Sequence, residues 1–428
     1  MSRRRLAQVL AIGAGPANLS LAALAEPLED ISVTILEARD SVSWHPGLLW
    51  SNSRLQVDGI KDLVSLIDPR SEFSFMNFLH EEGRLYRHLI ASKEYVSRAE
   101  FDQYFSWVAG RLDVHLGTTV KSIEHDGCCF LVETNSGTWE AETLVIGVGQ
   151  APFVPDCAQE ALGPGTWHSV YHLKDGMPVG DKHVLLVGGG QSSGEVAHDL
   201  LSGRTGLPSK LTWATGRGGL TPLDDSPFSD EWFNPAFVDY FNSLGAAQRD
   251  ASLVRQQAAY FGINRDLLAL LYRRLYELDY LIPGTFTHEI MAGVRLSKIW
   301  NQPDGFGATL RDVTANSTKE IDCDLVIFGT GFKNEIPRFF EPIMDRIMAR
   351  DGSYRVGDDY RIGWSGSEKG GIYVQNAALK THGVADANIS LAAWRSAKIL
   401  NSILGTERYS IGGQDITHLL GQGFNVVN

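Results

Sequence analysis

The chain has 428 residues, of which 43% are hydrophobic and 21% are charged. These values are typical of a globular protein with a large core, and they exclude an intrinsically disordered chain. The net charge of −13 argues against nucleic acid and an anionic membrane surface as partners, because both bind to basic faces.

The N-terminus resembles a secretory signal, since arginines at positions 3–5 precede an apolar run. Gly13, Gly15 and Pro16 interrupt that run, and a nucleotide-binding strand accounts for the same residues better. No other stretch reaches the roughly 20 apolar residues of a membrane span. We therefore expect a soluble, cytoplasmic protein without a metal site, whose cysteines are free thiols. The cysteines are Cys128, Cys129, Cys157 and Cys323.

The first 36 residues predict a β-α-β unit, with strands at 7–12 and 31–36 around a helix at 17–26. A turn with Gly13 and Gly15 joins the first strand to the helix. The first glycine permits the tight turn, and the second lets the backbone approach a pyrophosphate at the helix N-terminus.

Three further residues belong to this dinucleotide motif. Pro16 opens the helix, and Asn18 stands where a third glycine is common. Glu37 closes the second strand with a carboxylate that can accept a hydrogen bond from a ribose hydroxyl. We interpret the motif as a binding site for FAD.

The same pattern returns mid-chain, with strands at 183–187 and 209–214 around a helix at 193–202. Its turn contains Gly188 and Gly190, and Gln191 and Ser192 follow. After the second strand stands Arg217 in place of an acidic residue. A cation there suits the extra phosphate of NADPH, so we predict that this second site binds NADPH.

The predicted fold is therefore α/β, with two Rossmann-like dinucleotide-binding domains and a small helical domain that covers the substrate. Apolar strands within 143–152 and 324–332 end in glycine and mark the crossings between domains. We assign residues 1–165 and 325–428 to the FAD domain and residues 166–324 to the NADPH domain. The aromatic-rich segment 222–290 is expected to form the helical elaboration.

Two cofactor sites imply that a hydride passes from nicotinamide to flavin. A disulfide reductase needs a cysteine pair beside the flavin, and the sequence offers none. A flavin monooxygenase instead passes the electrons to dioxygen, and its flavin hydroperoxide chemistry needs no catalytic acid or base from the protein. The F-x-G-x-x-x-H signature of Baeyer–Villiger enzymes fails, since Leu162 and Pro164 replace its Phe and Gly before His168.

Several further segments resemble one family, the microbial N-hydroxylating flavin monooxygenases. These are the lysine, ornithine and diamine N-hydroxylases of hydroxamate siderophore biosynthesis. The resemblance extends over nearly the whole chain. It is carried by GAGPANLS (13–20), WHPG (44–47), LQ (55–56), IKDLV (60–64), DP (68–69), FSF (73–75), GGGQS (188–192), DE (230–231), FGTGF (328–332), THG (381–383) and NISLAAWR (388–395).

The resemblance implies roles for particular residues. Trp44, His45 and Gln56 would line the flavin, and Gln191 and Ser192 would contact NADP. Lys61 would reach the substrate carboxylate or the nicotinamide cofactor, and Ser390 would lie near the reacting amine. The resemblance also implies a homo-oligomer, and proteins of this family tend to form tetramers.

The substrate is expected to be a small aliphatic amine that reacts in its neutral form. Ornithine enzymes carry an asparagine that holds the amino-acid carboxylate, and Ala259 replaces it here. Asp58 could hold the second ammonium of a diamine, although Asp-Gly at 58–59 is also a turn signal. We therefore expect putrescine, cadaverine or L-lysine, with a lean to the diamine. L-ornithine, or a different soft nucleophile such as sulfur, remains the alternative.

Overall fold

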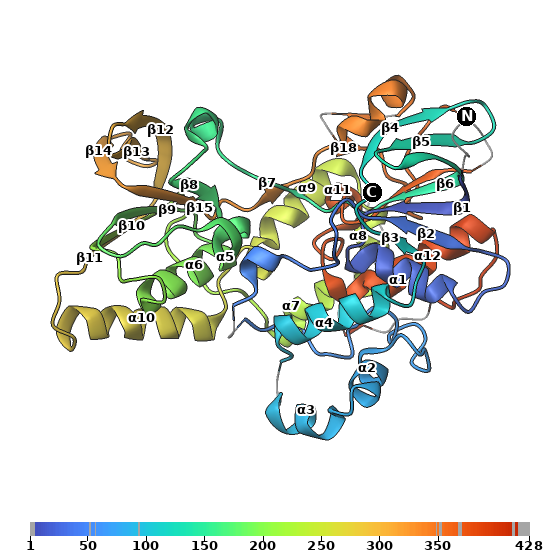
Figure 1. Cartoon of the computed structure of the whole chain (residues 1–428), viewed down its shortest axis with the longest axis horizontal. Helices are drawn as coiled ribbons and strands as arrows, with labels where there is room; N and C mark the ends of the chain where they lie inside the picture. The colour runs from blue at the N-terminus through green and yellow to red at the C-terminus, as the bar shows by residue number, and fades with distance from the viewer. Residues whose placement is uncertain are drawn as a thin grey trace, which may run out of the picture.

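The protein is described here from a computed structural model, which covers residues 5–50, 53–55, 57–92, 95–347, 349–350, 353–366, 370–412 and 416–417. Two separate sheets, one mixed and one parallel, each with helices against it, lie at opposite ends of its long axis (Figure 1). The first unit is built on a seven-stranded sheet and the second unit on a five-stranded one.

The sheet of the first unit has the strand order β3-β2-β1-β6-β5-β4, and β19 also pairs with β6. β1 runs parallel to both β2 and β6, as a nucleotide-binding sheet requires. Its strands are β1 (Arg5–Ile12), β2 (Val33–Leu36), β3 (Val114–His115), β4 (Val120–His125), β5 (Phe130–Thr134), β6 (Gly137–Ile146) and β19 (Ile372–Val374).

The sheet of the second unit has the order β11-β10-β9-β15-β8, with every neighbouring pair parallel. Its strands are β8 (Thr166–His168), β9 (His183–Val187), β10 (Lys210–Thr215), β11 (Thr287–Ala292) and β15 (Leu325–Phe328). The two predicted β-α-β units are thus present, and the predicted fold class is confirmed.

The described helices and short strands complete the framework. The α-helices are α1 (Pro16–Ala25), α2 (Phe75–Glu81), α3 (Leu85–Ala91), α4 (Arg98–Ala109), α5 (His172–Asp175), α6 (Gln191–Ser202), α7 (Pro227–Asp230), α8 (Pro235–Ser243), α9 (Ala246–Arg255), α10 (Arg265–Tyr280), α11 (Leu379–His382) and α12 (Ala392–Leu404). The 3-10 helices are η1 (Pro46–Leu48), η2 (Asp156–Ala161), η3 (Ser169–Tyr171), η4 (Glu231–Phe233), η5 (Gln257–Ala259), η6 (Arg338–Arg346) and η7 (Ile389–Leu391). Short strand pairs are β7 (Ala151–Pro152) with β16 (Phe332–Lys333), and β17 (Ala349–Arg350) with β18 (Ser353–Tyr354).

The second sheet is covered on both faces, which explains the continuous apolar composition of its central strand. Val184 and Leu186 of β9 pack with α6 and α10. Leu185 and Val187 pack on the other face with an antiparallel sheet that the sequence analysis did not predict. Its strands are β12 (Val294–Gln302), β13 (Gly305–Asp312) and β14 (Thr318–Cys323).

The structure corrects both predicted crossings between the units. β7 and β16 pair antiparallel, so the chain leaves the first unit and returns to it at one place. η2 packs against β12 in the second unit, although residues up to 165 were assigned to the first. β15 belongs to the second sheet, so the return crossing follows Phe328 and not residue 324. A glycine after an apolar strand marks the strand's end, but it does not say which sheet the strand joins.

The predicted helical elaboration at 222–290 is divided between the two units. α8 and α9 contact α11, and Lys398 of α12 forms an ion pair with Asp239 of α8 at 2.9 Å. α10 instead packs against α6 of the second unit. Within the described ranges, no helix has the length and apolar character needed to cross a membrane.

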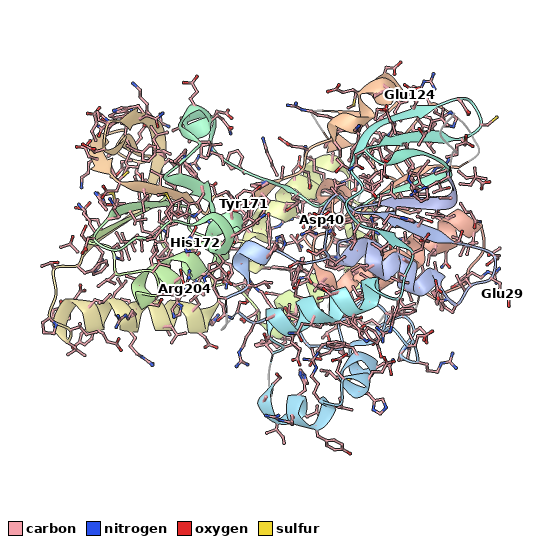
Figure 2. All side chains as sticks on the ribbon, viewed as in Figure 1. Glu29, Asp40, Glu124, Tyr171, His172 and Arg204 are labelled. Atoms are coloured by element: carbon pink, nitrogen blue, oxygen red, sulfur yellow. The ribbon has the colours of Figure 1, made fainter. Side chains whose placement is uncertain are left out.

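A buried polar network joins α5 to α6 in the second unit, where Figure 2 labels His172 and Arg204. His172 Nδ1 accepts a hydrogen bond from Trp167 Nε1 (3.2 Å), so its Nε2 carries the proton that it donates to Asp199 (3.0 Å). Arg204 donates two further bonds to the same carboxylate, at 2.7 and 2.8 Å. Burial raises the pKa of Asp199, but the bonds from His172 and Arg204 outweigh burial and bring the pKa to about 2.

Substitution Asp199→Asn is expected to lower the free energy of unfolding at pH 7 by about 2 kcal/mol, at 1.36 kcal/mol per pKa unit. Because the folded-state pKa lies below the ordinary value, this contribution is complete above pH 4 and declines as the pH falls towards 2. Urea unfolding at pH 7, 5 and 3 should therefore show a constant difference from wild type at the first two values and a smaller one at the third. Asp304 is exposed, so Asp304→Asn is the control. If Asp199→Asn lowers the free energy of unfolding as much at pH 3 as at pH 7, the depressed pKa of Asp199 is refuted.

Candidate functional site

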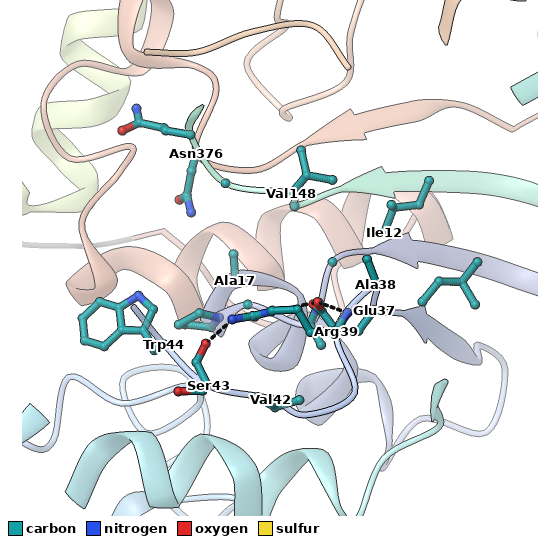
Figure 3. Close-up of a pocket in the computed structure, with 18 of the residues that line it drawn as sticks. Ile12, Ala17, Glu37, Ala38, Arg39, Val42, Ser43, Trp44, Val148 and Asn376 are labelled. Atoms are coloured by element: carbon teal, nitrogen blue, oxygen red, sulfur yellow. Dashed lines mark hydrogen bonds and ion pairs between the residues drawn. The ribbon is translucent and has the colours of Figure 1, made fainter. Parts of the chain in front are cut away.

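The first glycine turn lies against the backbone that follows β6. Gly13 has a φ of +95°, and a Cβ at this position would lie 2.6 Å from the carbonyl oxygen of Gly147. A cavity of about 550 Å³ opens beside this turn (Figure 3). The predicted FAD residues that line it are Gly13, Gly15, Pro16, Glu37, Trp44 and His45.

Glu37 holds the turn while it lines the cavity. Its Oε2 accepts from the backbone N–H of Ala14 at 2.8 Å, and its Oε1 accepts from Arg39 Nε at 3.0 Å (Figure 3). Burial raises the pKa of Glu37, but the hydrogen bonds from Arg39 and Ala14 outweigh burial and place the pKa below its usual range. The carboxylate is therefore ionised at neutral pH, as a ribose-hydroxyl acceptor must be.

Asn18 does not line the cavity, although it was predicted as an FAD contact. Its side chain is fully buried and donates to the carbonyl oxygens of Ile12 (3.1 Å) and Gly13 (2.8 Å). Its Oδ1 accepts from Gln375 Nε2 at 2.9 Å. Asn18 therefore shapes the glycine turn from behind.

The donors around this cavity fit FAD. The N-cap of α1 is Gly15, which has no side chain to satisfy the first-turn N–H groups, so a pyrophosphate can accept from them. Asn376 also lines the cavity, with a φ of +59° and a buried Oδ1 that has no hydrogen-bond partner among the described residues. Sequence reasoning missed Asn376; its signal was a polar residue soon after the apolar strand β19.

His45 and Trp44 lie where this cavity meets a second, smaller one. His45 adopts a φ of +51°, and its burial, with Arg98 and Arg39 nearby, lowers its pKa to about 4. The imidazole is therefore neutral at physiological pH. The backbone N–H of Trp44 donates to Asp102, which holds the segment against α4.

The second glycine turn repeats the construction of the first. Gly188 has a φ of +130°, and a Cβ there would lie 2.1 Å from the carbonyl oxygen of Gly329. A cavity of about 760 Å³ lies beside it. All the predicted NADP residues line this cavity, namely Gly188, Gly190, Gln191, Ser192 and Arg217.

A middle cavity of about 320 Å³ lies between the two nucleotide cavities. It shares Trp44 and His45 with the first cavity and Ser192 with the second. Phe332 and Ala387 line all three. A group bound at the first turn and a group bound at the second can therefore meet at the residues that these cavities share.

Comparison with known proteins identifies this arrangement. Residues 5–334 match the family described as L-lysine 6-monooxygenase/L-ornithine 5-monooxygenase. The chain belongs to this family. The predicted recognition, the enzyme class of flavin-dependent N-monooxygenase and the cofactor pair FAD and NADPH are thereby confirmed.

Three relatives illustrate the similarity. The L-lysine N6-monooxygenase of Escherichia coli is 30% identical, over 94% of this chain and 95% of its own. The FAD-bound cadaverine monooxygenase DfoA of the desferrioxamine pathway, from Erwinia amylovora, is 30% identical with a TM-score of 0.89, over 97% and 98%. The Kutzneria sp. 744 ornithine N-hydroxylase, solved with reduced FAD, NADP+ and L-ornithine, is 28% identical with a TM-score of 0.85, over 94% and 99%.

The residues predicted to bind substrate in this N-monooxygenase lie outside the three cavities. Asp58 is exposed, and its Oδ1 accepts from the backbone N–H of Ile60 at 2.9 Å, as a turn residue does. Ser390 is buried, and its hydroxyl donates at 2.7 Å to Oδ1 of Asn388, which is the N-cap residue of η7. Asn388 and Ile389 line the middle cavity in its place. Neither the family resemblance that named Ser390 nor the position of Asp58 before Lys61 says in which direction a side chain points.

Lys61 and Gln56 are the two remaining residues that were predicted to belong to the site. Lys61 is half-buried and interacts electrostatically with Asp230 of α7. Gln56 lies outside the described residues. Its neighbours Leu55 and Val57 both line the middle cavity.

An ion pair crosses between the two units beside the middle cavity. Arg98, the first residue of α4, donates to both carboxylate oxygens of Glu195 on α6, at 2.9 and 3.1 Å. Gln191 donates to the same carboxylate at 2.9 Å and accepts from the backbone N–H of Asn264 at 2.8 Å. The pair is largely buried, and it links α4 to α6, whose first residues line the second cavity, and to the N-cap of α10.

Glu195→Gln is expected to weaken NADP+ binding about tenfold, which is ~1.4 kcal/mol, because breaking a buried pair leaves Arg98 uncompensated and frees α6. Calorimetric titration of the FAD-loaded enzyme with NADP+ measures the affinity, and stopped-flow reduction by NADPH measures the rate of flavin reduction. Glu277→Gln breaks an ion pair within α10 and is the matched control, expected to change neither quantity. Equal effects of the two substitutions would contradict a role for the inter-unit pair.

Proposed function

We propose that this N-monooxygenase hydroxylates the terminal primary amine of a diamine such as putrescine or cadaverine, or of L-lysine, and that a diamine is preferred. The proposal rests on one observation, the middle cavity that adjoins both nucleotide cavities and shares Phe332 and Ala387 with them. The first glycine turn would hold FAD and the second NADPH, and together they would supply the reduced flavin through which one oxygen atom of dioxygen reaches an amine nitrogen in the middle cavity while the other leaves as water.

The residues of the chain exclude water from this region and orient its occupants. Leu48, Leu49, Leu55, Val57 and Ile389 give the middle cavity an apolar wall. Such a wall removes the solvent that would compete for the reactive oxygen. The uncharged His45 adds a polar group at the junction without adding a charge.

The nitrogen must react as a neutral amine, yet an aliphatic ammonium has a pKa of about 10.4. Deprotonation near neutral pH therefore costs about 4 kcal/mol. Arg98 and Arg395 line the middle cavity, but each is paired with a carboxylate, Glu195 and Asp386, so their charges largely cancel. Burial against the apolar wall supplies the main effect, because desolvation disfavours the charged form.

The charge around Lys61 supports a diamine over an amino acid. Burial raises the pKa of Asp230, Lys61 lowers it, and Asp225 and Asp224 raise it, so Asp230 lies among two further carboxylates and one lysine. Their net negative potential favours an ammonium over a carboxylate. Ala259 is buried and offers no hydrogen bond to a carboxylate, in agreement with this preference. The similarity to a cadaverine monooxygenase points the same way.

The same proposal includes the pathway, the cellular compartment and the oligomeric state of the enzyme. Its hydroxylated product would supply a hydroxamate siderophore pathway, and the enzyme would work in the cytoplasm as a homo-oligomer, a tetramer by analogy with the family. The first glycine turn would hold FAD and the second would hold NADPH.

NADPH oxidation and hydroxylamine formation should be measured together with putrescine, cadaverine, L-lysine and L-ornithine. The highest kcat/KM with coupled hydroxylamine formation is expected for a diamine, followed by L-lysine. Strict dependence on L-ornithine would overturn the substrate assignment. NADPH oxidation that yields no hydroxylamine from any amine, but an oxidised sulfur compound from a thioether, would overturn amine hydroxylation itself.

Asp230→Asn is expected to raise the KM for putrescine and cadaverine about threefold at little change in kcat, because one exposed carboxylate that would attract the distal ammonium is lost. The matched control is Asp58→Asn, which removes a charge from the exposed turn and should leave KM unchanged. A raised KM in Asp58→Asn alone would restore Asp58 as the ammonium partner.

A further inference from the structure

We propose that Arg295, at the start of β12, binds the 2′-phosphate of NADPH together with Arg217 and so determines the preference for NADPH over NADH. The inference deepens the proposed function, since it concerns how the nicotinamide cofactor is selected at the second glycine turn. The sequence indicates only Arg217 for this contact, because Arg295 lies in a segment with no nucleotide motif.

Position is the first argument. Arg295 and Arg217 line the same cavity as Gly188 and Gly190. A Cβ added to Gly216 would lie 2.7 Å from Arg295 Nε, so the Arg295 side chain lies directly against the loop that follows β10. In a Rossmann unit, the residues after the second strand are those that meet the ribose 2′ position.

The engagement of Arg217 is the second argument. Its Nη1 donates to the carbonyl oxygen of Gly189 at 3.2 Å, and its guanidinium lies 5.2 Å from the ring centroid of Phe261. These contacts orient one edge of the guanidinium and leave its other donors for a ligand. A phosphate dianion offers three acceptor oxygens, which a second arginine can share.

The charge balance is the third argument. Within the described part of the chain, neither Arg217 nor Arg295 has an ion-pair partner. Arg295 stands directly opposite Arg311 on β13, and like charges in that position destabilise a sheet. The only carboxylate among the described residues that line the cavity belongs to Asp386, which accepts from the backbone N–H of Ala378 at 2.7 Å. A bound dianion would relieve this excess of positive charge.

The test is calorimetric titration of the FAD-loaded enzyme, without any amine, using four probes: NADP+, NAD+, 2′,5′-ADP and 5′-AMP. Arg295→Gln is expected to weaken NADP+ and 2′,5′-ADP about tenfold and to leave NAD+ and 5′-AMP unchanged, because one charge-assisted contact to the 2′-phosphate is lost. Arg295→Lys should recover part of the affinity. In steady state the KM for NADPH should rise while kcat at saturating NADPH stays the same.

The matched control is Lys298→Gln, which removes a cation from the same strand. Lys298 is exposed, lies over the ring of Trp300 and is not part of the cavity. An equal loss for all four probes in Arg295→Gln would show that Arg295 only shapes the cavity, and no loss would show that Arg217 acts alone; either result overturns the proposal. Because no amine is present, these outcomes are independent of whether the enzyme hydroxylates a diamine, lysine or nothing at all.

Discussion

The close approach of pairs of glycine-rich backbones is the constraint on which the rest of this structure depends. In the first unit, the turn at Gly13 touches the backbone at Gly147, and in the second the turn at Gly188 touches Gly329. Each contact joins the carboxyl ends of two parallel strands, where open α/β sheets bind ligands. A side chain at any of these contacts would push the strands apart and fill the space that a dinucleotide needs.

The antiparallel pair β7 and β16 joins the two units beside the cavities of both glycine turns. Because both crossings lie in this one pair, Phe332 on β16 can line the first, middle and second cavities at once. The ion pair between Arg98 and Glu195 holds the units together at another place beside the middle cavity. The middle cavity is thus lined mainly by the first unit and completed by Ser192 of the second.

Buried polar side chains hold the first glycine turn in place on the side away from its cavity. Apolar side chains line the middle cavity. Asn18 satisfies two backbone carbonyls of the first turn and is held in turn by Gln375. Arg395 donates to Gln375 and is nearly fully buried, yet it also borders the middle cavity. The network therefore connects the first glycine turn to the wall of the middle cavity.

The sequence by itself determined the two nucleotide units, the cofactor pair and the family, because these depend on local order: an apolar strand, a glycine turn and a helix, followed by Glu37 or Arg217. It did not determine the sheet to which β15 belongs, the division of the helical segment, or the β12–β14 sheet that carries Arg295. It also favoured Asp58 and Ser390 over their neighbours, although their side chains bond to local groups in a turn and a cap. Only the tertiary structure decided these points, since the direction of a side chain and the partner of a strand depend on contacts between residues far apart in the chain.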